Sequence, residues 1–206
     1  MSSMTMWILL RAAGIGAYVM LYLSVAWGLV STTSIVTKHV SKPSSILFHQ
    51  FVATVGVVLI GVHVALLVVD SFMPFRWVDV LVPMHSTFRP FAVALGVLAM
   101  YGTVIVLVTS WLRKPIGTKA WRTIHLLAVP AFTLSLAHGV FAGSDTSRSW
   151  MWGTYAFTGL SVLFLVLVRA LTYGYRPPRV APPDAGAKNG SATAKNVPST
   201  GSASIV

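Results

Sequence analysis

The chain has 206 residues, of which 55% are apolar and only 9% are charged, and it contains no cysteine. Soluble domains carry about 25% charged residues, so the composition excludes an ordinary soluble fold. The lack of cysteine also excludes disulfides, iron–sulfur clusters, thiolate-ligated haem and covalently attached c-type haem.

Five segments contain no Asp, Glu, Lys or Arg: residues 12–37, 43–69, 90–112, 123–144 and 149–168. Each is about as long as the roughly 20 apolar residues that cross a bilayer as a helix. The sequence therefore predicts an all-α polytopic membrane bundle of five transmembrane helices, at about 6–30, 46–69, 91–112, 121–141 and 150–173. Arg11 follows the start of the first apolar run, so we expect a retained span there and not a cleaved signal peptide.

The net charge of +11 is explained by the positive-inside rule and not by nucleic-acid binding, because no basic run carries interleaved aromatics. Of the 15 Lys and Arg residues, 11 fall in the first loop, in the third loop and in the region from Arg169 onward. This bias predicts a multi-pass plasma (inner) membrane protein with its N-terminus outside and its C-terminus in the cytoplasm. We expect a membrane domain at 1–175 and a disordered cytoplasmic tail at 176–206, which is rich in Pro, Ala, Gly, Ser and Asn.

Two of the expected spans carry a histidine near each end. The second span has His49 and His63 in a His-x13-His pattern, and the fourth has His125 and His138 in a His-x12-His pattern. At about 1.5 Å per residue each pair is separated by roughly 20 Å, most of the apolar thickness of a bilayer. Ionisable residues within a membrane indicate function by default, and imidazole is a usual axial ligand of haem iron. These histidines predict two stacked b-type haems, one near each membrane face; hydrogen bonding between helices is the alternative role.

The two spacings differ in helical geometry. The step from His49 to His63 returns to within about 40° of the same face, whereas the step from His125 to His138 lands about 140° away. We therefore expect a distortion in the fourth span, and Pro130 is the candidate for a kink. Close approach of helices or cofactor is expected at small residues, with ordinary helix packing as an equal alternative: Gly56, Gly61, Gly96, Gly102 and Gly139.

Haem propionates need cationic or hydrogen-bonding partners. Trp121 and Arg122 precede His125 by one turn, and Arg11 and Arg89 belong to the outer side, so these four are the predicted cofactor-binding residues. His85 lies in the outer loop; a solvated loop residue is the first interpretation, with a proton donor, a metal contact or an acceptor site as alternatives.

The pattern resembles the ferric reductase-like transmembrane domain, a family that includes NADPH oxidases, ferric reductases and the haem-binding membrane partner of the periplasmic methionine sulfoxide reductase. The resemblance covers about residues 7–173. It rests on the two histidine spacings, on Trp121-Arg122-Thr123-Ile124-His125 and on Thr109-Ser110 before a basic loop.

The resemblance implies two b haems, ligated by His49 with His125 on the inner side and by His63 with His138 on the outer side. Electrons would then cross the membrane to an outer acceptor. The oxidases have six spans where five are expected here, and the Gly-rich nucleotide fingerprint is absent from the sequence. The chain is therefore expected to be an oxidoreductase subunit without its own flavin or NAD(P)H domain. Its donor would be a separate protein or a membrane quinol.

Three other interpretations stay open at this point. One is that the haem is cargo or a sensory ligand, which predicts reversible haem loss without loss of the fold. A single-haem cytochrome subunit would use one histidine pair as ligands and the other for structure. A non-redox scaffold or small transporter would use all four histidines for packing or proton movement, and it would be colourless when purified.

Overall fold

The structure of the chain is a computed structural model that describes residues 3–31, 40–71 and 75–172. His39 and the tail at 176–206, which is predicted to be disordered, lie outside the described residues. Within the described residues the secondary structure is entirely helical. The elements are α1 (Ser3–Val30), α3 (Lys42–Val69), α4 (Trp77–Leu81), α5 (Pro90–Trp111), α6 (Arg113–Ile116), α7 (Thr118–His125), α8 (Ala128–Ala142) and α9 (Ser149–Thr172).

Five helical segments are long and apolar enough to cross a membrane, which confirms the five predicted helices. They are α1, α3, α5, α7 with α8, and α9. The second span begins at Lys42, four residues before the predicted start. Ser41 caps it by accepting a hydrogen bond from the Ser44 backbone, and Pro43 lies in the first turn, where its missing N–H costs nothing.

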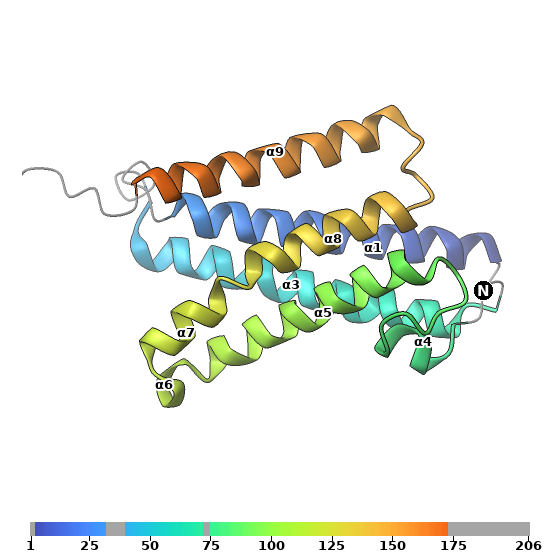
Figure 1. The fold of residues 1–206 in the computed structure, drawn as a ribbon, viewed down its shortest axis with the longest axis horizontal. Helices are drawn as coiled ribbons and strands as arrows, with labels where there is room; N and C mark the ends of the chain where they lie inside the picture. Colours follow the sequence, from blue (N-terminus) through green and yellow to red (C-terminus); the bar gives the residue numbers. More distant parts are fainter. Residues whose placement is uncertain (1–2, 32–39, 72–74, 173–206) are drawn as a thin grey trace, which may run out of the picture. The chain divides into compact units, whose positions relative to one another are not determined.

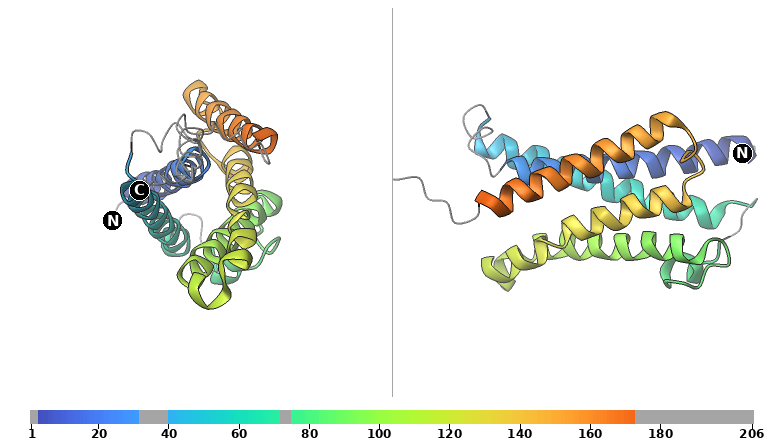
Figure 2. Two further views of the ribbon diagram at one scale, coloured as in Figure 1. Left: turned by 90° about the vertical axis from the view of Figure 1, so that its left-hand side faces the viewer. Right: turned by 45° about the horizontal axis from the view of Figure 1, so that its top comes forward.

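Successive spans run in opposite directions (Figure 1). α1 and α3 form one antiparallel pair, and α5 with α7 and α8 forms a second. We call the end of the bundle at which α1 begins and α4 lies the α4 end, and the opposite end the α6 end. α8 lies between α5 and α9, as the end-on view in Figure 2 shows.

The best-buried part of the bundle lies where α1, α8 and α9 meet. Tyr18 stacks on Phe132 with ring centroids 5.7 Å apart and meets Tyr155 edge-on at 5.6 Å. The Tyr18 hydroxyl is hydrogen-bonded to Thr158, so the polar atom of this aromatic cluster is satisfied. The cluster attaches α9 to the rest of the bundle on the side away from α3.

The fourth span contains the predicted distortion, but the break lies upstream of Pro130. α7 ends at His125, Leu126 and Leu127 form a turn, and α8 starts at Ala128. Pro130 is therefore in the first turn of α8, where its missing N–H is tolerated. A proline ring clashes with the carbonyl four residues earlier, which here belongs to Leu126, and this explains why the chain breaks there and not at Pro130 itself.

Candidate functional site

The four histidines form two pairs at two levels of the bundle. We call His63 and His138 the α4-end pair, and His49 and His125 the α6-end pair. Each imidazole points its Nδ1 at a neighbouring helix: α1 for the two histidines of α3, and α5 for the two histidines of the fourth span. The sequence predicts all four on helices at matched ends, and the structure adds the partner of each ring.

The α4-end pair is held by backbone carbonyls. Nδ1 of His63 lies 3.1 Å from the carbonyl oxygen of Leu10, and Nδ1 of His138 lies 2.7 Å from that of Ala92. A carbonyl oxygen only accepts hydrogen bonds, so in the neutral imidazoles both Nδ1 atoms carry the proton. Both Nε2 atoms are therefore left with a free lone pair.

Glycines make these two carbonyls accessible. A Cβ at Gly14 would lie 2.9 Å from Cε1 of His63, and a Cβ at Gly96 would lie 2.7 Å from Nδ1 of His138. Each glycine lies one helical turn after the carbonyl that binds the ring. Any larger side chain at either position would push the imidazole away from its hydrogen-bond acceptor.

The α6-end pair is held by serine hydroxyls at longer range. Nδ1 of His49 lies 3.5 Å from Oγ of Ser24. Nδ1 of His125 lies 3.5 Å from Oγ of Ser110. The rings of His49 and His125 contact each other edge-on with centroids 6.1 Å apart.

The residues that contact the histidines recur at a regular interval along α1 and along α5. On α1 the carbonyl–glycine pair Leu10 with Gly14 recurs as Ser24 with Gly28, at the same interval that separates His49 from His63. A Cβ at Gly28 would lie 3.4 Å from Cε1 of His49.

The same interval recurs on α5. There the pair Ala92 with Gly96 is followed by Val106 with Ser110. The two antiparallel helix pairs therefore repeat one arrangement, with Ser110 standing where the other three positions have glycine.

No described side-chain nitrogen or oxygen is both buried and without a hydrogen-bond partner. The Nε2 atoms of the four histidines make no hydrogen bond to any described residue, so each opens onto accessible space. All four side chains are half-buried. The arrangement offers two pairs of neutral imidazoles with available lone pairs, at two depths.

Trp121 lies beside His125, as predicted, but through a contact that the sequence does not indicate. Its ring centroid is 5.0 Å from that of His125, and its indole N–H donates to Oγ of Ser110 over 3.3 Å. The guanidinium of Arg113 lies over the indole ring, 4.4 Å from its centroid. Arg122 is exposed on α7.

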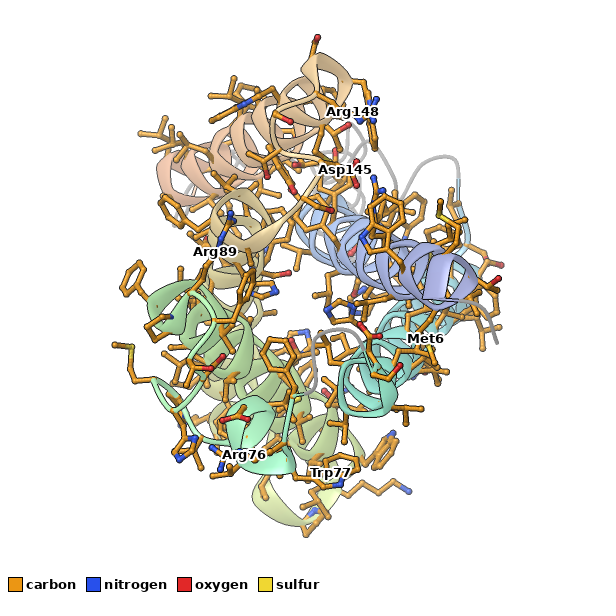
Figure 3. All side chains as sticks on the ribbon, turned by 90° about the vertical axis from the view of Figure 1, so that its right-hand side faces the viewer. Met6, Arg76, Trp77, Arg89, Asp145 and Arg148 are labelled. Carbon is orange, nitrogen blue, oxygen red and sulfur yellow. The ribbon has the colours of Figure 1, made fainter. Side chains whose placement is uncertain are left out.

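Arg11 and Arg89, the two arginines predicted to bind propionates at the outer side, have partners within the protein. Arg11 forms a two-pronged ion pair with Asp145 and lies 3.9 Å from the centre of the Trp7 ring. Arg89 adopts a left-handed conformation (φ 41°) and donates to the carbonyl of Phe141 over 2.7 Å, at the last turn of α8. Figure 3, which looks onto the α4 end, shows Arg89, Asp145 and Arg148 around this end of the bundle.

His85 is not a free loop side chain. Its Nδ1 lies 2.7 Å from Asp79, which also accepts hydrogen bonds from the backbone and side chain of Arg76. The Arg76 side chain, followed by His85, lowers the pKa of the Asp79 carboxyl well below its usual range. The cluster joins α4 to the loop that leads to α5, and 40% of the His85 side chain remains exposed.

Of the glycines predicted to allow close approach, Gly61 faces open space. Gly56, Gly102 and Gly139 pack against Met20, Ala131 and Tyr155, which is ordinary helix packing. Gly96 is the predicted glycine that touches a histidine. The sequence analysis does not identify four further histidine neighbours, which are Gly14, Gly28, Ser24 and Ser110. The interval from Gly14 to Gly28 equals that from His49 to His63 and is the signal that could have found the neighbours on α1, whereas the spacing of His125 and His138 differs by one residue from that of Gly96 and Ser110.

Among the described residues no group of three or more His, Cys, Asp or Glu side chains converges on a possible metal site. An all-protein metal centre is therefore not formed there, whereas a bis-histidine site needs only two protein ligands. Comparison of the chain with protein-family models, curated proteins and solved structures finds no match.

Proposed function

We propose that the protein transfers electrons across a membrane through two bis-histidine b-type haems, ligated by the α6-end pair and the α4-end pair. The observation that carries this proposal is the contact of Nδ1 with a backbone carbonyl at His63 and His138. Backbone carbonyls hold Nδ1–H of His63 and His138, which leaves Nε2 to bind metal. A metal-bound histidine commonly donates its second ring N–H to a carbonyl in this way.

The α6-end pair also has a suitable separation. Two imidazoles that share one metal through bonds of about 2 Å have ring centroids roughly 6 Å apart. His49 and His125 are 6.1 Å apart by the same measure. Glycines beside three of the four rings leave room for the imidazoles against the preceding helix, so that Nδ1 faces that helix and Nε2 points away from it.

The chain's own residues would determine the environment of each haem, which when bound supplies a one-electron iron couple. The carbonyls of Leu10 and Ala92 orient the α4-end imidazoles and raise their basicity. At about 1.5 Å per residue, the interval from His49 to His63 separates the two levels by roughly 20 Å along α3. The two sites together would therefore span most of the apolar layer.

The resemblance to the ferric reductase-like family supplies the rest of the proposal. Electrons would come from a separate cytoplasmic protein or a membrane quinol and would leave to an acceptor on the outer side. The Lys and Arg bias favours a plasma (inner) membrane orientation with the α6 end in the cytoplasm. Arg122 remains free to bind a propionate at that end. Arg11 and Arg89 could do so only in addition to the partners they already have.

The test is a reduced-minus-oxidised visible spectrum of the purified protein, with haem quantified as the pyridine haemochrome. We expect a b-type spectrum and about two haems per chain. His125→Ala and His138→Ala should each reduce the content to about one, and the double variant should be colourless. Haem-free protein from cells supplied with haem, still folded by circular dichroism, would overturn the proposal in favour of a scaffold or transporter.

A single-haem cytochrome is the second candidate, and one observation favours it. The α6-end rings contact each other, whereas each α4-end ring contacts the helix beside it. In that case His125→Ala would remove all haem and His138→Ala none.

A further inference from the structure

The register shared by α1 and α5 assigns a role to Ser110 and Trp121. Two histidines hydrogen-bond the backbone of the preceding helix, at Leu10 and Ala92, and His49 lies beside Ser24 at the equivalent position. The fourth equivalent acceptor is the carbonyl of Val106, which follows Ala92 at the interval that separates Leu10 from Ser24. His125 does not reach it, because Ser110 stands where the other positions have glycine.

Ser110 is placed between the carbonyl and the imidazole. Its hydroxyl donates to the Val106 carbonyl over 2.6 Å, and the same oxygen lies 3.5 Å from Nδ1 of His125. Trp121 donates its indole N–H to that oxygen over 3.3 Å. A hydroxyl has one proton, and here that proton goes to Val106.

The proton count fixes the direction of the last hydrogen bond. Because Ser110 has already donated its proton, its oxygen can only accept from His125. Indole is a donor only, so Trp121 cannot reverse this direction. The neutral His125 must then carry its proton on Nδ1, which leaves the Nε2 lone pair free.

We propose that Ser110 and Trp121 are positioning residues that hold His125 in the Nδ1–H tautomer. In this relay the Ser110 oxygen accepts the hydrogen bond of His125 in place of the Val106 carbonyl, and Ser110 in turn donates to that carbonyl. The indole ring, with its centroid 5.0 Å from that of the His125 ring and with Arg113 packed over it, limits the tilt of the imidazole as well. The tautomer is a property of the protein alone; only its use in ligating iron rests on the proposed function.

The relay matters because His125 lacks the short carbonyl contact that holds each α4-end imidazole. It is the last residue of α7, directly before the turn at Leu126 and Leu127. Its hydrogen bond is longer than the 2.7 Å and 3.1 Å bonds at the α4 end. Without an acceptor at Nδ1 the ring would be free to place its proton on Nε2, which would block ligation.

The experiment is ¹⁵N NMR of histidine-labelled, haem-free protein in lipid bilayers at neutral pH, where the two ring nitrogens report the tautomer. We expect His125 to be mainly Nδ1–H in the wild type. In Ser110→Ala the ratio of Nδ1–H to Nε2–H should fall about fivefold to tenfold, as expected from loss of one hydrogen bond of typical strength. Ser110→Thr retains the hydroxyl and should keep the wild-type ratio.

Ser110→Gly is the decisive variant. It restores the glycine found at the three equivalent positions and so should open the Val106 carbonyl directly to His125. We expect the Nδ1–H tautomer to return, although the variant lacks the hydroxyl. Trp121→Phe keeps the ring but loses the N–H donor, and should shift the ratio less than Ser110→Ala does.

Thr109→Ala is the matched control, because Thr109 also donates to α5 carbonyls, over 2.7 Å to Ile105, but does not contact His125. His138 in the same samples is the internal reference. A wild-type His125 that is mainly Nε2–H, or a ratio unchanged in Ser110→Ala, would overturn the relay. The same is true if Ser110→Gly behaves as Ser110→Ala. None of these outcomes depends on haem, so loss of the proposed function would be detected separately by the haem assay.

Discussion

The α4-end pair and the α6-end pair use the same residue type in the same register, yet they are held differently. At the α4 end, backbone carbonyl oxygens lie 3.1 Å from Nδ1 of His63 and 2.7 Å from Nδ1 of His138, and a glycine lies beside each ring. At the α6 end, serine hydroxyls lie 3.5 Å from Nδ1 of His49 and His125. A backbone carbonyl gives a direct contact at ordinary hydrogen-bond distance, whereas a serine hydroxyl gives a longer one.

The two ends also differ in charge. The acidic residues Asp70, Asp79 and Asp145 belong to the loops and helix ends of the α4 end, and the last two bind arginines there. The α6–α7 region from Arg113 to Arg122 has four basic residues and no acidic one. Ion pairs therefore join neighbouring elements at the α4 end, while the basic residues of the α6–α7 region have no acidic neighbours in sequence.

The largest expected effect comes from filling the space beside an α4-end ring. In Gly96→Val the new Cβ would lie 2.7 Å from Nδ1 of His138, which would displace the ring from the Ala92 carbonyl. We expect loss of haem from the α4-end pair only, together with a destabilisation of about 1–3 kcal/mol from overpacking. Haem content and thermal unfolding measure the two effects.

Gly61→Val is the control, since a Cβ at Gly61 meets nothing within 4 Å. It should retain full haem content and near wild-type stability. If Gly96→Val kept its haem at the α4-end pair, the contact of His138 with the Ala92 carbonyl would not be what holds His138 for ligation.

The sequence predicts the five membrane helices and places two histidines on each of two of them, because apolar length and spacing along one helix are local properties. The partners of the histidines depend on how two helices are aligned with each other. Leu10 and Ala92 contribute only a backbone carbonyl, which every residue has. The interval from Gly14 to Gly28 equals that from His49 to His63, and only this match could have indicated that the two glycines lie beside the histidines.

The roles predicted for Trp121, Arg11 and Pro130 from their neighbours in sequence describe their contacts in the structure only in part. The sequence places Trp121 beside His125, but the bond of Trp121 to Ser110 spans two helices and has no local signature. Arg11 is expected to be available for propionates, whereas Asp145, 134 residues later in the chain, forms an ion pair with it. Pro130 indicates a distortion but not its position, because the clash of a proline acts on the preceding turn.

A second, intermediate effect is expected from the ion pair between Arg11 and Asp145. Asp145→Asn leaves the guanidinium of a largely buried Arg11 without a counter-charge, which typically costs about 3 kcal/mol. Arg11 directly follows Leu10, whose carbonyl binds His63, so the variant should loosen the His63 hydrogen bond more than that of His49. Thermal unfolding and ¹⁵N histidine spectra measure the two changes.

Arg148→Gln is the matched control, because the Arg148 side chain is 66% exposed and lies 3.5 Å from Asp145. Exposed pairs contribute about 0–1 kcal/mol, so we expect little change. Equal losses in Asp145→Asn and Arg148→Gln would mean that Arg11 does not hold α1 in place at this end.

The smallest effect concerns pH and is confined to the α4 end. Arg76 and His85 lower the pKa of Asp79 below its ordinary value of 3.8, so the folded cluster favours the ionised carboxylate. A depressed folded pKa gives stability that is fully present above the unfolded pKa and is lost as the pH falls below it. We therefore expect α4 to be unaffected between neutral pH and about pH 5 and to loosen below about pH 4.

Amide hydrogen exchange of α4 as a function of pH, corrected for the intrinsic rate, measures this local stability. Asp79→Asn should remove the acid-dependent component while leaving exchange in α7 unchanged, because the described part of the α6 end includes no carboxylate side chain. His85→Gln should weaken α4 less, since Arg76 contributes more of the effect on Asp79 than His85 does. Acid loosening that persists in Asp79→Asn would assign the pH response to a group outside this cluster, and the charge difference between the two ends would not be its cause.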